Sequence, residues 1–172
     1  MTEEYAASRY EEACALLPGR LRAAAMAIDR RQKAEAEELR LRITRPLHLA
    51  LPQGELALPQ TRVTRSDLEQ VLDRATEYSR YAAAETLRHG YLTAAGGFRV
   101  GVCGTALPSG GENEGVRDVS SLTIRIPRVR EGAAQPVLPE LVEDARPLST
   151  LVLSPPGGGK TTLLRDLVRL LS

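Results

Sequence analysis

Hydrophobic and polar positions along the 172-residue chain follow two different periods, and these periods predict both helices and strands. Near the N-terminus, apolar residues recur at helical spacing, and Pro18-Gly19 divides the run over residues 3–28 into two predicted helices. Strict apolar–polar alternation predicts strands with one buried face and one solvated face. The alternating stretches are residues 39–43, 47–51, 56–58 and 122–126.

Two more helices are expected between the third and last of these strands. Thr64 with Asp67 and Ser66 with Glu69 both have capping-box spacing, so the first helix begins in one of two registers. The second helix is expected over residues 78–88, because the helical pattern stops at a His-Gly pair.

Residues 90–107 predict a β-hairpin, and the residues after them predict a loop, a linker and a short helix. Two strands flank the turn Ala95-Gly96-Gly97. Residues 108–115 are rich in Gly, Ser, Glu and Asn and are expected to form a polar loop. Residues 132–139 are expected to be a linker, and residues 138–144 a short helix.

The candidate chemistry lies near the C-terminus. Leu151-Val152-Leu153 predicts a short buried strand, a loop of Pro and Gly follows, and a helix begins at Thr161. A strand, a glycine-rich loop and a helix in this order are typical of a phosphate-binding P-loop. The expected nucleotide-binding residues are Ser154, Pro155, Pro156, Gly157, Gly158, Gly159, Lys160, Thr161 and Thr162.

Each residue type in this loop has a chemical reason. Backbone N–H groups converge on phosphate oxygens only where side chains are absent, which accounts for Gly157, Gly158 and Gly159. Lys160 would supply an ammonium to the β- and γ-phosphates, and Thr161 a hydroxyl to Mg²⁺. The expected ligands are therefore ATP and Mg²⁺. Ser154 stands where the general pattern has Gly, at a position that serves a turn.

These elements predict an α/β fold class, with the chain divided into two domains. Residues 1–135 are expected to form an α+β N-terminal domain with helices and an antiparallel or mixed sheet. Residues 136–172 are expected to be the start of a P-loop NTPase domain, truncated after the helix that follows the loop.

The short distance between the loop and Ser172 limits the chemistry. A P-loop ATPase also needs further strands, an acidic residue that holds Mg²⁺, and a group that positions the attacking water. These parts usually lie downstream of the loop. We therefore expect either the front part of a longer ATPase or a vestigial site, with no catalytic residue in this chain, and leave open whether it is an enzyme.

Composition excludes several functional classes. A net charge of +1, five Tyr, one Phe and no Trp argue against nucleic-acid binding, which needs positive charge and stacking side chains. The two cysteines fit no metal or redox spacing, which favours a reducing compartment. No run of 18 apolar residues and no signal peptide are present, so we expect no transmembrane segment and a cytoplasmic location.

Several motifs together resemble a known family over about residues 36 to 172. They are Leu39-Arg40-Leu41-Arg42, Gly90-Tyr91-Leu92-Thr93, Gly96-Gly97-Phe98-Arg99-Val100-Gly101, Ser121-Leu122-Thr123-Ile124-Arg125-Ile126, and residues 154–166 with the loop. This ordered series resembles the stage III sporulation protein AA family, which belongs to the secretion ATPases. Its members also resemble this chain in the Ser-Pro-Pro start of the loop.

The resemblance implies an ATPase of an endospore-forming bacterium, on the mother-cell side of a channel complex across the forespore membranes. It implies a location in the mother-cell cytoplasm, with peripheral attachment at the forespore membrane left open. It implies nucleotide and membrane-embedded sporulation channel proteins as partners, and a homo-oligomer, usually a hexameric ring. It also implies that N-terminal arginines reach the nucleotide phosphates, for which Arg99, Arg125 and Arg128 are the candidates. The alternative for these arginines is a solvated strand face.

Two alternatives to a motor ATPase stay open at this point. Residues 1–135 could be a non-catalytic interaction module that docks on a membrane-bound sporulation partner. The locally basic residues 120–130 are the feature that a nucleic-acid binder would use. We favour the ATP-binding portion of a secretion-type motor.

Overall fold

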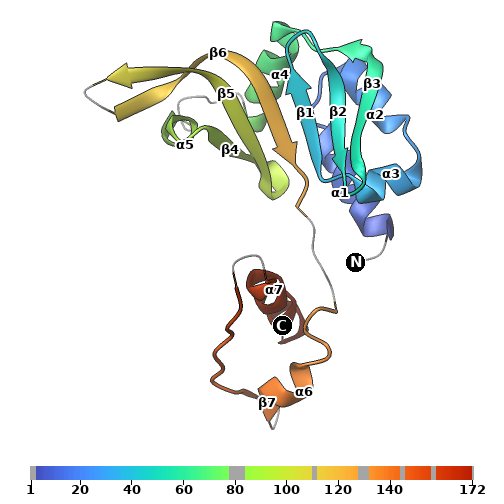
Figure 1. Cartoon of the computed structure of the whole chain (residues 1–172), viewed down its shortest axis with the longest axis vertical. Coiled ribbons are helices and arrows are strands. Elements are labelled where there is room, and N and C mark those ends of the chain that lie inside the picture. Colours follow the sequence, from blue (N-terminus) through green and yellow to red (C-terminus); the bar gives the residue numbers. More distant parts are fainter. Residues whose placement is uncertain are drawn as a thin grey trace. The chain divides into compact units, whose positions relative to one another are not determined.

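The computed structural model describes residues 3–77, 84–109, 112–127, 132–143, 146–155 and 158–171. The chain divides into two compact units, residues 2–127 and residues 128–172. The larger unit has helices α1 (Glu3–Cys14), α2 (Gly19–Met26), α3 (Arg30–Glu35), α4 (Arg65–Ala75) and α5 (Ala84–Arg88) (Figure 1). Its strands are β1 (Glu38–Arg42), β2 (Pro46–Leu51), β3 (Gly54–Arg62), β4 (Tyr91–Ala94), β5 (Phe98–Ser109) and β6 (Glu112–Arg125), with a 3₁₀ turn, η1 (Ala95–Gly97), between β4 and β5.

The six strands form one sheet in the order β3-β2-β1-β6-β5-β4, and every neighbouring pair is antiparallel. Strands β1 to β3 and strands β4 to β6 are each a local meander. The meanders join where β1 pairs with β6, in the register Leu39↔Ile124 and Leu41↔Leu122. These side chains are buried, so the junction between the meanders is also part of the core.

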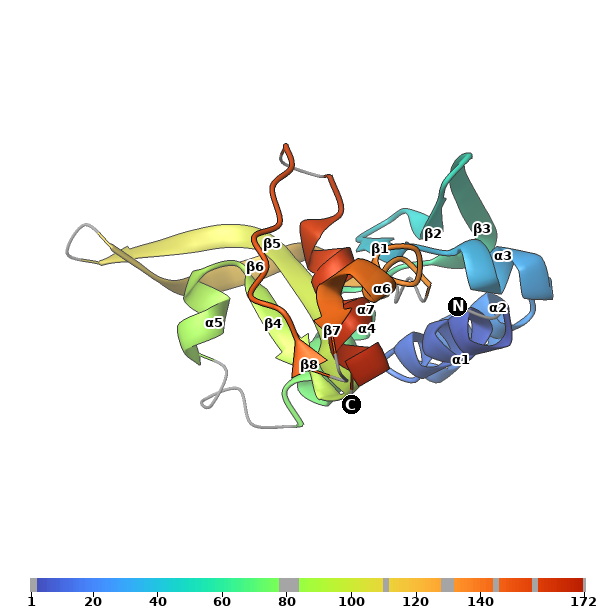
Figure 2. The ribbon, with the colours of Figure 1, turned by 90° about the horizontal axis from the view of Figure 1, so that it is seen from below.

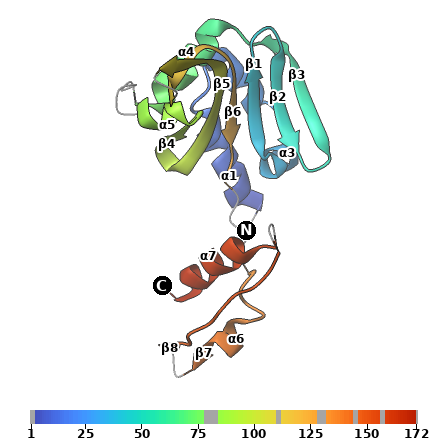
Figure 3. The ribbon, with the colours of Figure 1, turned by 60° about the vertical axis from the view of Figure 1, so that its left-hand side comes forward.

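The long helices of this unit cover one face of the sheet. Figure 3 shows α1 behind the sheet, and Figure 2 shows α1 and α2 on one side of β1, β2 and β3. Tyr10, Leu17, Leu21 and Leu68 from the helical layer are fully buried in the same cluster as Leu39 of β1. Burying a large aliphatic side chain stabilises the fold by roughly 1.5–3 kcal/mol, so this layer holds the unit together.

The opposite face of the sheet is polar. In β1, Leu39 and Leu41 are buried, whereas Arg40 and Arg42 are exposed. The alternation seen in the sequence is therefore confirmed as one covered face and one open face. The predicted α+β class, with helices and an antiparallel sheet, is confirmed.

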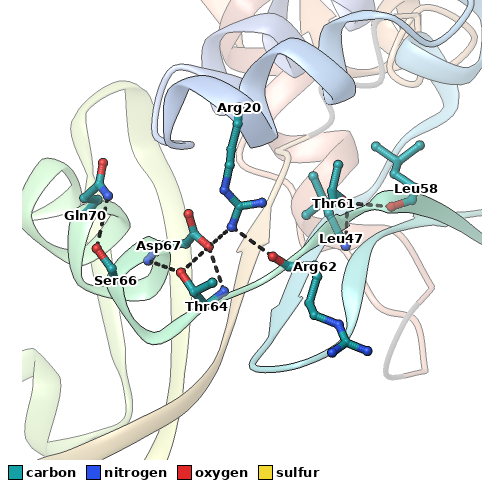
Figure 4. A network of polar contacts seen from close by, with 9 residues as sticks. All are labelled: Arg20, Leu47, Leu58, Thr61, Arg62, Thr64, Ser66, Asp67 and Gln70. Carbon is teal, nitrogen blue, oxygen red and sulfur yellow. Dashed lines mark hydrogen bonds and ion pairs between the residues drawn. The ribbon is translucent and has the colours of Figure 1, made fainter.

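The start of α4 shows which capping register the chain uses (Figure 4). Thr64 and Asp67 form the capping box: the Thr64 backbone N–H donates to Asp67 Oδ2 at 2.7 Å, and the Asp67 N–H donates to Thr64 Oγ1 at 3.3 Å. Arg20 of α2 pairs with the same carboxylate and also donates to the Arg62 carbonyl at 2.9 Å. The chain uses the capping box of Thr64 with Asp67 rather than that of Ser66 with Glu69, because the Asp67 side chain is buried and also links α2 to α4.

The polar loop predicted over residues 108–115 is wrong where the structure describes it. Residues 108–109 and 112–115 are strand, and they pair as Pro108↔Asn113 and Ser109↔Glu112. The antiparallel ladder of β5 and β6 overrides the turn preference of the polar residues. The helix predicted over 78–88 is described only as α5, from Ala84, because residues 78–83 lie outside the described residues.

The smaller unit contains α6 (Leu138–Leu141), β7 (Val142–Glu143), β8 (Arg146–Pro147) and α7 (Lys160–Leu171). Strands β7 and β8 pair with each other as a two-stranded ribbon. Among the described residues of the whole chain, no helix has the length and apolar character needed to cross a membrane.

Cys14 and Cys103 are both free thiols but differ in environment, because Cys14 is buried and Cys103 is exposed. Burial raises the pKa of the Cys14 thiol to about 12. Since the thiolate is the reactive form, we expect a thiol reagent at pH 8 to label one cysteine rapidly in the folded chain and two in denaturant. The Cys103→Ser variant should lose the rapid labelling of the folded chain. Rapid labelling that survived in this variant would contradict the burial of Cys14.

Gly104 lies where the register of β5 against β6 shifts. A Cβ there would meet the Arg117 carbonyl oxygen at 2.6 Å and the Val119 Cα at 3.0 Å. Because these are backbone atoms of the paired strand, Gly104→Ala should lower the free energy of unfolding in urea by about 1–3 kcal/mol. Gly19→Ala is the control, because a Cβ at Gly19 meets nothing within 4 Å. Equal stability of the two variants would contradict the close approach at Gly104.

Candidate nucleotide-binding site

The segment before the phosphate loop is not the buried strand that the sequence predicts. Residues 148–155 belong to no sheet, and the side chains of Leu151 and Leu153 are 80% and 81% exposed. A strand needs a neighbour that supplies hydrogen-bond partners. No such neighbour flanks this segment among the described residues, so apolar composition alone does not make it a strand or bury it.

Two glycines of the loop are required for different reasons. A Cβ at Gly158 would lie 2.5 Å from Ser154 Oγ and 2.9 Å from Ser154 Cβ, so this position has no room for a side chain. A Cβ at Gly159 would meet nothing within 4 Å, but this residue adopts φ +83°, a conformation that L side chains rarely take. The first glycine permits close packing of the loop, and the second permits the turn into α7.

Lys160 folds back onto the loop that precedes it. Its ammonium donates to the Ser154 carbonyl at 2.8 Å, to Ser154 Oγ at 3.1 Å and to the Pro155 carbonyl at 3.0 Å. These three bonds use all three N–H donors of the ammonium. Ser154, which replaces the glycine of the general pattern, therefore binds the loop lysine through its hydroxyl and packs against Gly158. The sequence pattern did not reveal this role.

Helix α7 begins directly at the loop. Its first backbone bond runs from the Leu163 N–H to the Gly159 carbonyl at 2.9 Å. The N–H groups of Lys160, Thr161 and Thr162 precede that bond and have no intrahelical partner, which is the arrangement that receives an anion at a helix N-terminus. α7 is twelve residues long, so its dipole adds to this preference.

A pocket of about 580 Å³ opens beside the loop. Its wall includes Ser154, Gly158, Gly159, Lys160 and Thr162, five of the residues predicted to bind nucleotide. Thr161, predicted to reach Mg²⁺, is exposed and does not line the pocket, and within the described residues its hydroxyl has no hydrogen bond.

Pro156 and Gly157 lie outside the described residues, as does Arg128. The other two candidate arginines, Arg99 and Arg125, are directly opposed on β5 and β6. Arg99 stacks over the Tyr91 ring at 4.0 Å from its centroid, and Arg125 pairs with Glu38 at 3.3 Å. The structure thus brings these two together on the open face of the sheet, each with a local partner.

Asp166 is a buried carboxylate in α7 that the sequence pattern did not single out. It is 1% exposed, and its Oδ2 accepts a bond of 2.9 Å from the Ala134 N–H. Its Oδ1 accepts from Arg169, one turn further along α7, at 2.9 Å. The backbone bond from Ala134 is the main reason that the pKa of Asp166 is lowered. Asp166 thus ties residues 132–134 to the helix that follows the phosphate loop.

The sequence comparisons place the chain among sporulation proteins. The family model described as "Sporulation stage III, protein AA" matches residues 7–172. Stage III sporulation protein AA of Bacillus subtilis (strain 168) is 41% identical over 161 residues, which are 94% of this chain and 52% of that protein. The chain therefore spans about half the length of this curated relative.

Solved structures with a similar chain path include two ATPases. The X-ray structure of the Legionella pneumophila ATPase DotB matches with a TM-score of 0.44 and 16% identity, over 99% of this chain and 42% of that chain. The X-ray structure of the Yersinia pseudotuberculosis ATPase DotB matches with a TM-score of 0.40 and 12% identity, over 78% of this chain and 38% of that chain.

The Asp166 anchor predicts a pH-dependent local stability. Because the pKa of Asp166 is lower in the folded chain, its contribution is complete above the unfolded pKa of about 3.9 and is lost as pH falls through the folded pKa. Asp166→Asn should therefore lower the melting temperature at pH 7, with a smaller further loss on acidification than in the unchanged chain. It should also speed hydrogen exchange at the Ala134 amide.

Glu140→Gln is the matched control for this experiment, because Glu140 is an exposed acid of α6 in the same unit. Exchange at Ala134 that stays as slow in Asp166→Asn as in Glu140→Gln would contradict the anchor.

Proposed function

The chain belongs to the sporulation stage III protein AA family, and from this premise we propose that it is the ATP-binding portion of a secretion-type motor ATPase. The motor would act at a channel complex of the forespore membranes, on the mother-cell side. The family's sporulation role supports the setting, and the phosphate loop supports the chemistry. The observation that carries the proposal is the Lys160 ammonium, held within one loop by Ser154 and Pro155 at the N-terminus of α7.

The residues present fit a nucleoside triphosphate. The loop combines a glycine without room for a side chain, Gly158, with a glycine of positive φ, Gly159. The N–H groups at the start of α7 would receive phosphate oxygens, and Lys160 would exchange its three loop oxygens for phosphate oxygens. That exchange is favourable because a charged phosphate is a stronger acceptor than a neutral carbonyl.

Mg²⁺ would be held largely by water and by the phosphates, as is usual for this ion. The Thr161 hydroxyl, which has no partner among the described residues, is the protein group available for it. Bound Mg²⁺ would neutralise phosphate charge. A P-loop ATPase also uses an acidic residue for the metal and a group that orients water, and we assign neither role to a residue of this chain.

We also propose that the whole protein assembles as a homo-oligomeric ring, in which Arg99 and Arg125 supply positive charge toward nucleotide phosphates. Both guanidiniums have planar donors suited to phosphate oxygens. Their present partners, Tyr91 and Glu38, lie on an open sheet face and hold them weakly.

Lys160→Ala tests the nucleotide site directly. A charged hydrogen bond to phosphate is worth about 1.5–3 kcal/mol, so titration calorimetry with Mg²⁺-ATP should show affinity weakened by roughly 10-fold to 150-fold. Arg165→Ala is the control, since it removes one exposed positive charge from the same helix. If Lys160→Ala and Arg165→Ala reduced the affinity for Mg²⁺-ATP equally, the assignment of the nucleotide site to the loop would be refuted. If the unchanged chain bound no nucleotide, the docking-module alternative would become the better one.

A further inference from the structure

A second pocket opens on the uncovered face of the sheet in the larger unit. It has a volume of about 370 Å³ and shares no residue with the phosphate loop. Its wall comes from β1, β2, β3 and β6 and from the turn between β1 and β2, and it includes Arg40 and Arg42 from the exposed face of β1. Three arginines, Arg40, Arg42 and Arg45, line it against one carboxylate, Glu55. The pocket is thus small, polar and positively charged.

Some arginines of this sheet face already form ion pairs within the protein. Arg40 pairs with Glu38 at 2.8 Å and also pairs with Glu55, so the carboxylate of the pocket is neutralised within it. Arg125 pairs with Glu38 as well. The charges of Arg40 and Arg125 are therefore balanced by neighbouring carboxylates of the same sheet.

Arg42 and Arg45 differ from the others. Both are exposed and line the pocket, and among the described residues neither guanidinium has a hydrogen bond or an ion pair. Two unpaired guanidiniums at one depression leave a local excess of positive charge and about ten N–H donors without a protein acceptor. This combination is what an oxyanion needs.

The backbone that carries Arg42 and Arg45 is held in an unusual turn. Thr44, between them, adopts φ +70°, which is strained for a β-branched residue. Hydrogen bonds of 2.9 Å from the Thr44 N–H to the Val63 carbonyl, and from the Val63 N–H to the Arg45 carbonyl, fasten the turn to the end of β3. The two arginines are therefore presented by a fixed backbone rather than by a loose loop.

Neutral donors lie next to these arginines. Ser121 is the cross-strand partner of Arg42, and Thr123 is the partner of Arg40. Both residues line the pocket, and in the described part of the chain neither hydroxyl has a hydrogen-bond partner. Directly opposed residues have Cβ atoms about 4.5–5.5 Å apart, so one ligand group can reach a hydroxyl and a guanidinium together.

We propose that this pocket binds a phosphate group, with Arg42 and Arg45 as charged donors and Ser121 and Thr123 as neutral donors. A phosphate fits better than a single carboxylate because its dianion balances two guanidiniums and offers an oxygen to each hydroxyl. The same group occurs in soluble phosphate compounds and in the headgroups of anionic lipids. The pocket volume lies at the small end of ligand pockets, which span roughly 300–1,000 Å³.

The test uses the full 172-residue chain with Lys160→Ala, so that the phosphate loop does not contribute. Titration calorimetry with inorganic pyrophosphate should show binding by this chain. Adding Arg42→Ala and Arg45→Ala should weaken that binding at least about tenfold, because charge-assisted bonds are lost. Adding Arg22→Ala and Arg30→Ala removes the same two charges from exposed helix positions and should change the affinity less than about twofold.

Further variants guard against a trivial loss of structure. Arg42→Lys with Arg45→Lys keeps the charge but loses the planar pair of donors, so binding should be intermediate, and all variants should keep the same melting temperature. Pyrophosphate binding that is absent from the Lys160→Ala chain would overturn the proposal. So would equal binding with and without Arg42 and Arg45, or equal weakening in the helix control.

Vesicles distinguish the two sources of the phosphate. Sedimentation with phosphatidylglycerol vesicles, compared with phosphatidylcholine vesicles, that depends on Arg42 and Arg45 would assign the pocket to a lipid headgroup. Pyrophosphate binding that depends on these arginines, with no sedimentation, would assign it to a soluble phosphate compound. Neither result depends on Lys160, so the nucleotide proposal and this one stand or fall separately.

Discussion

The antiparallel pairing of β1 with β6 is the contact on which the larger unit depends. The other strand pairs of this sheet join neighbours along the chain, whereas this pair joins residues 38–42 to residues 121–125. Its inward side chains, Leu39, Leu41, Leu122 and Ile124, are part of the buried core. Closing so long a loop costs conformational entropy, which the burial of these residues offsets.

This one junction also creates the open polar face. Because side chains alternate across a strand, the register that buries Leu39 against Ile124 must place Arg40 beside Thr123 and Arg42 beside Ser121 on the other side. The proposed phosphate pocket and the pair formed by Arg99 and Arg125 both lie on that face. A shift of one residue would bury arginines, so core packing determines which basic residues are available to ligands.

The described residues of the predicted phosphate loop are held by contacts between residues that are close in the sequence. Gly158 leaves room for Ser154, Gly159 adopts the positive φ that leads into α7, and Lys160 binds the carbonyls that the turn exposes. None of these contacts requires a distant strand. These contacts are present even though Leu151 and Leu153, just before Ser154, are exposed. Asp166 adds a longer connection, to the Ala134 backbone.

The sequence by itself determined the features that depend on short-range physics. Periodicity predicted α1, α2, α4 and the strands of the six-stranded sheet, and spacing narrowed the α4 cap to two registers. Of the helix predicted over residues 138–144, only α6 (Leu138–Leu141) is helical, and residues 142–143 are strand. The Gly-Gly-Gly-Lys-Thr-Thr run predicts a phosphate loop, and its role stays a prediction. Only the tertiary structure decided which cap is used, because the choice depends on Arg20 from another helix.

The tertiary structure also decided three outcomes that the sequence predicted wrongly or did not address. The polar residues 108–109 and 112–115 continue the β5–β6 ladder, Leu151 and Leu153 stay exposed, and Arg42 has no partner among the described residues while Arg40 has two. These outcomes depend on which segments meet in space, and that information is absent from any local window of residues.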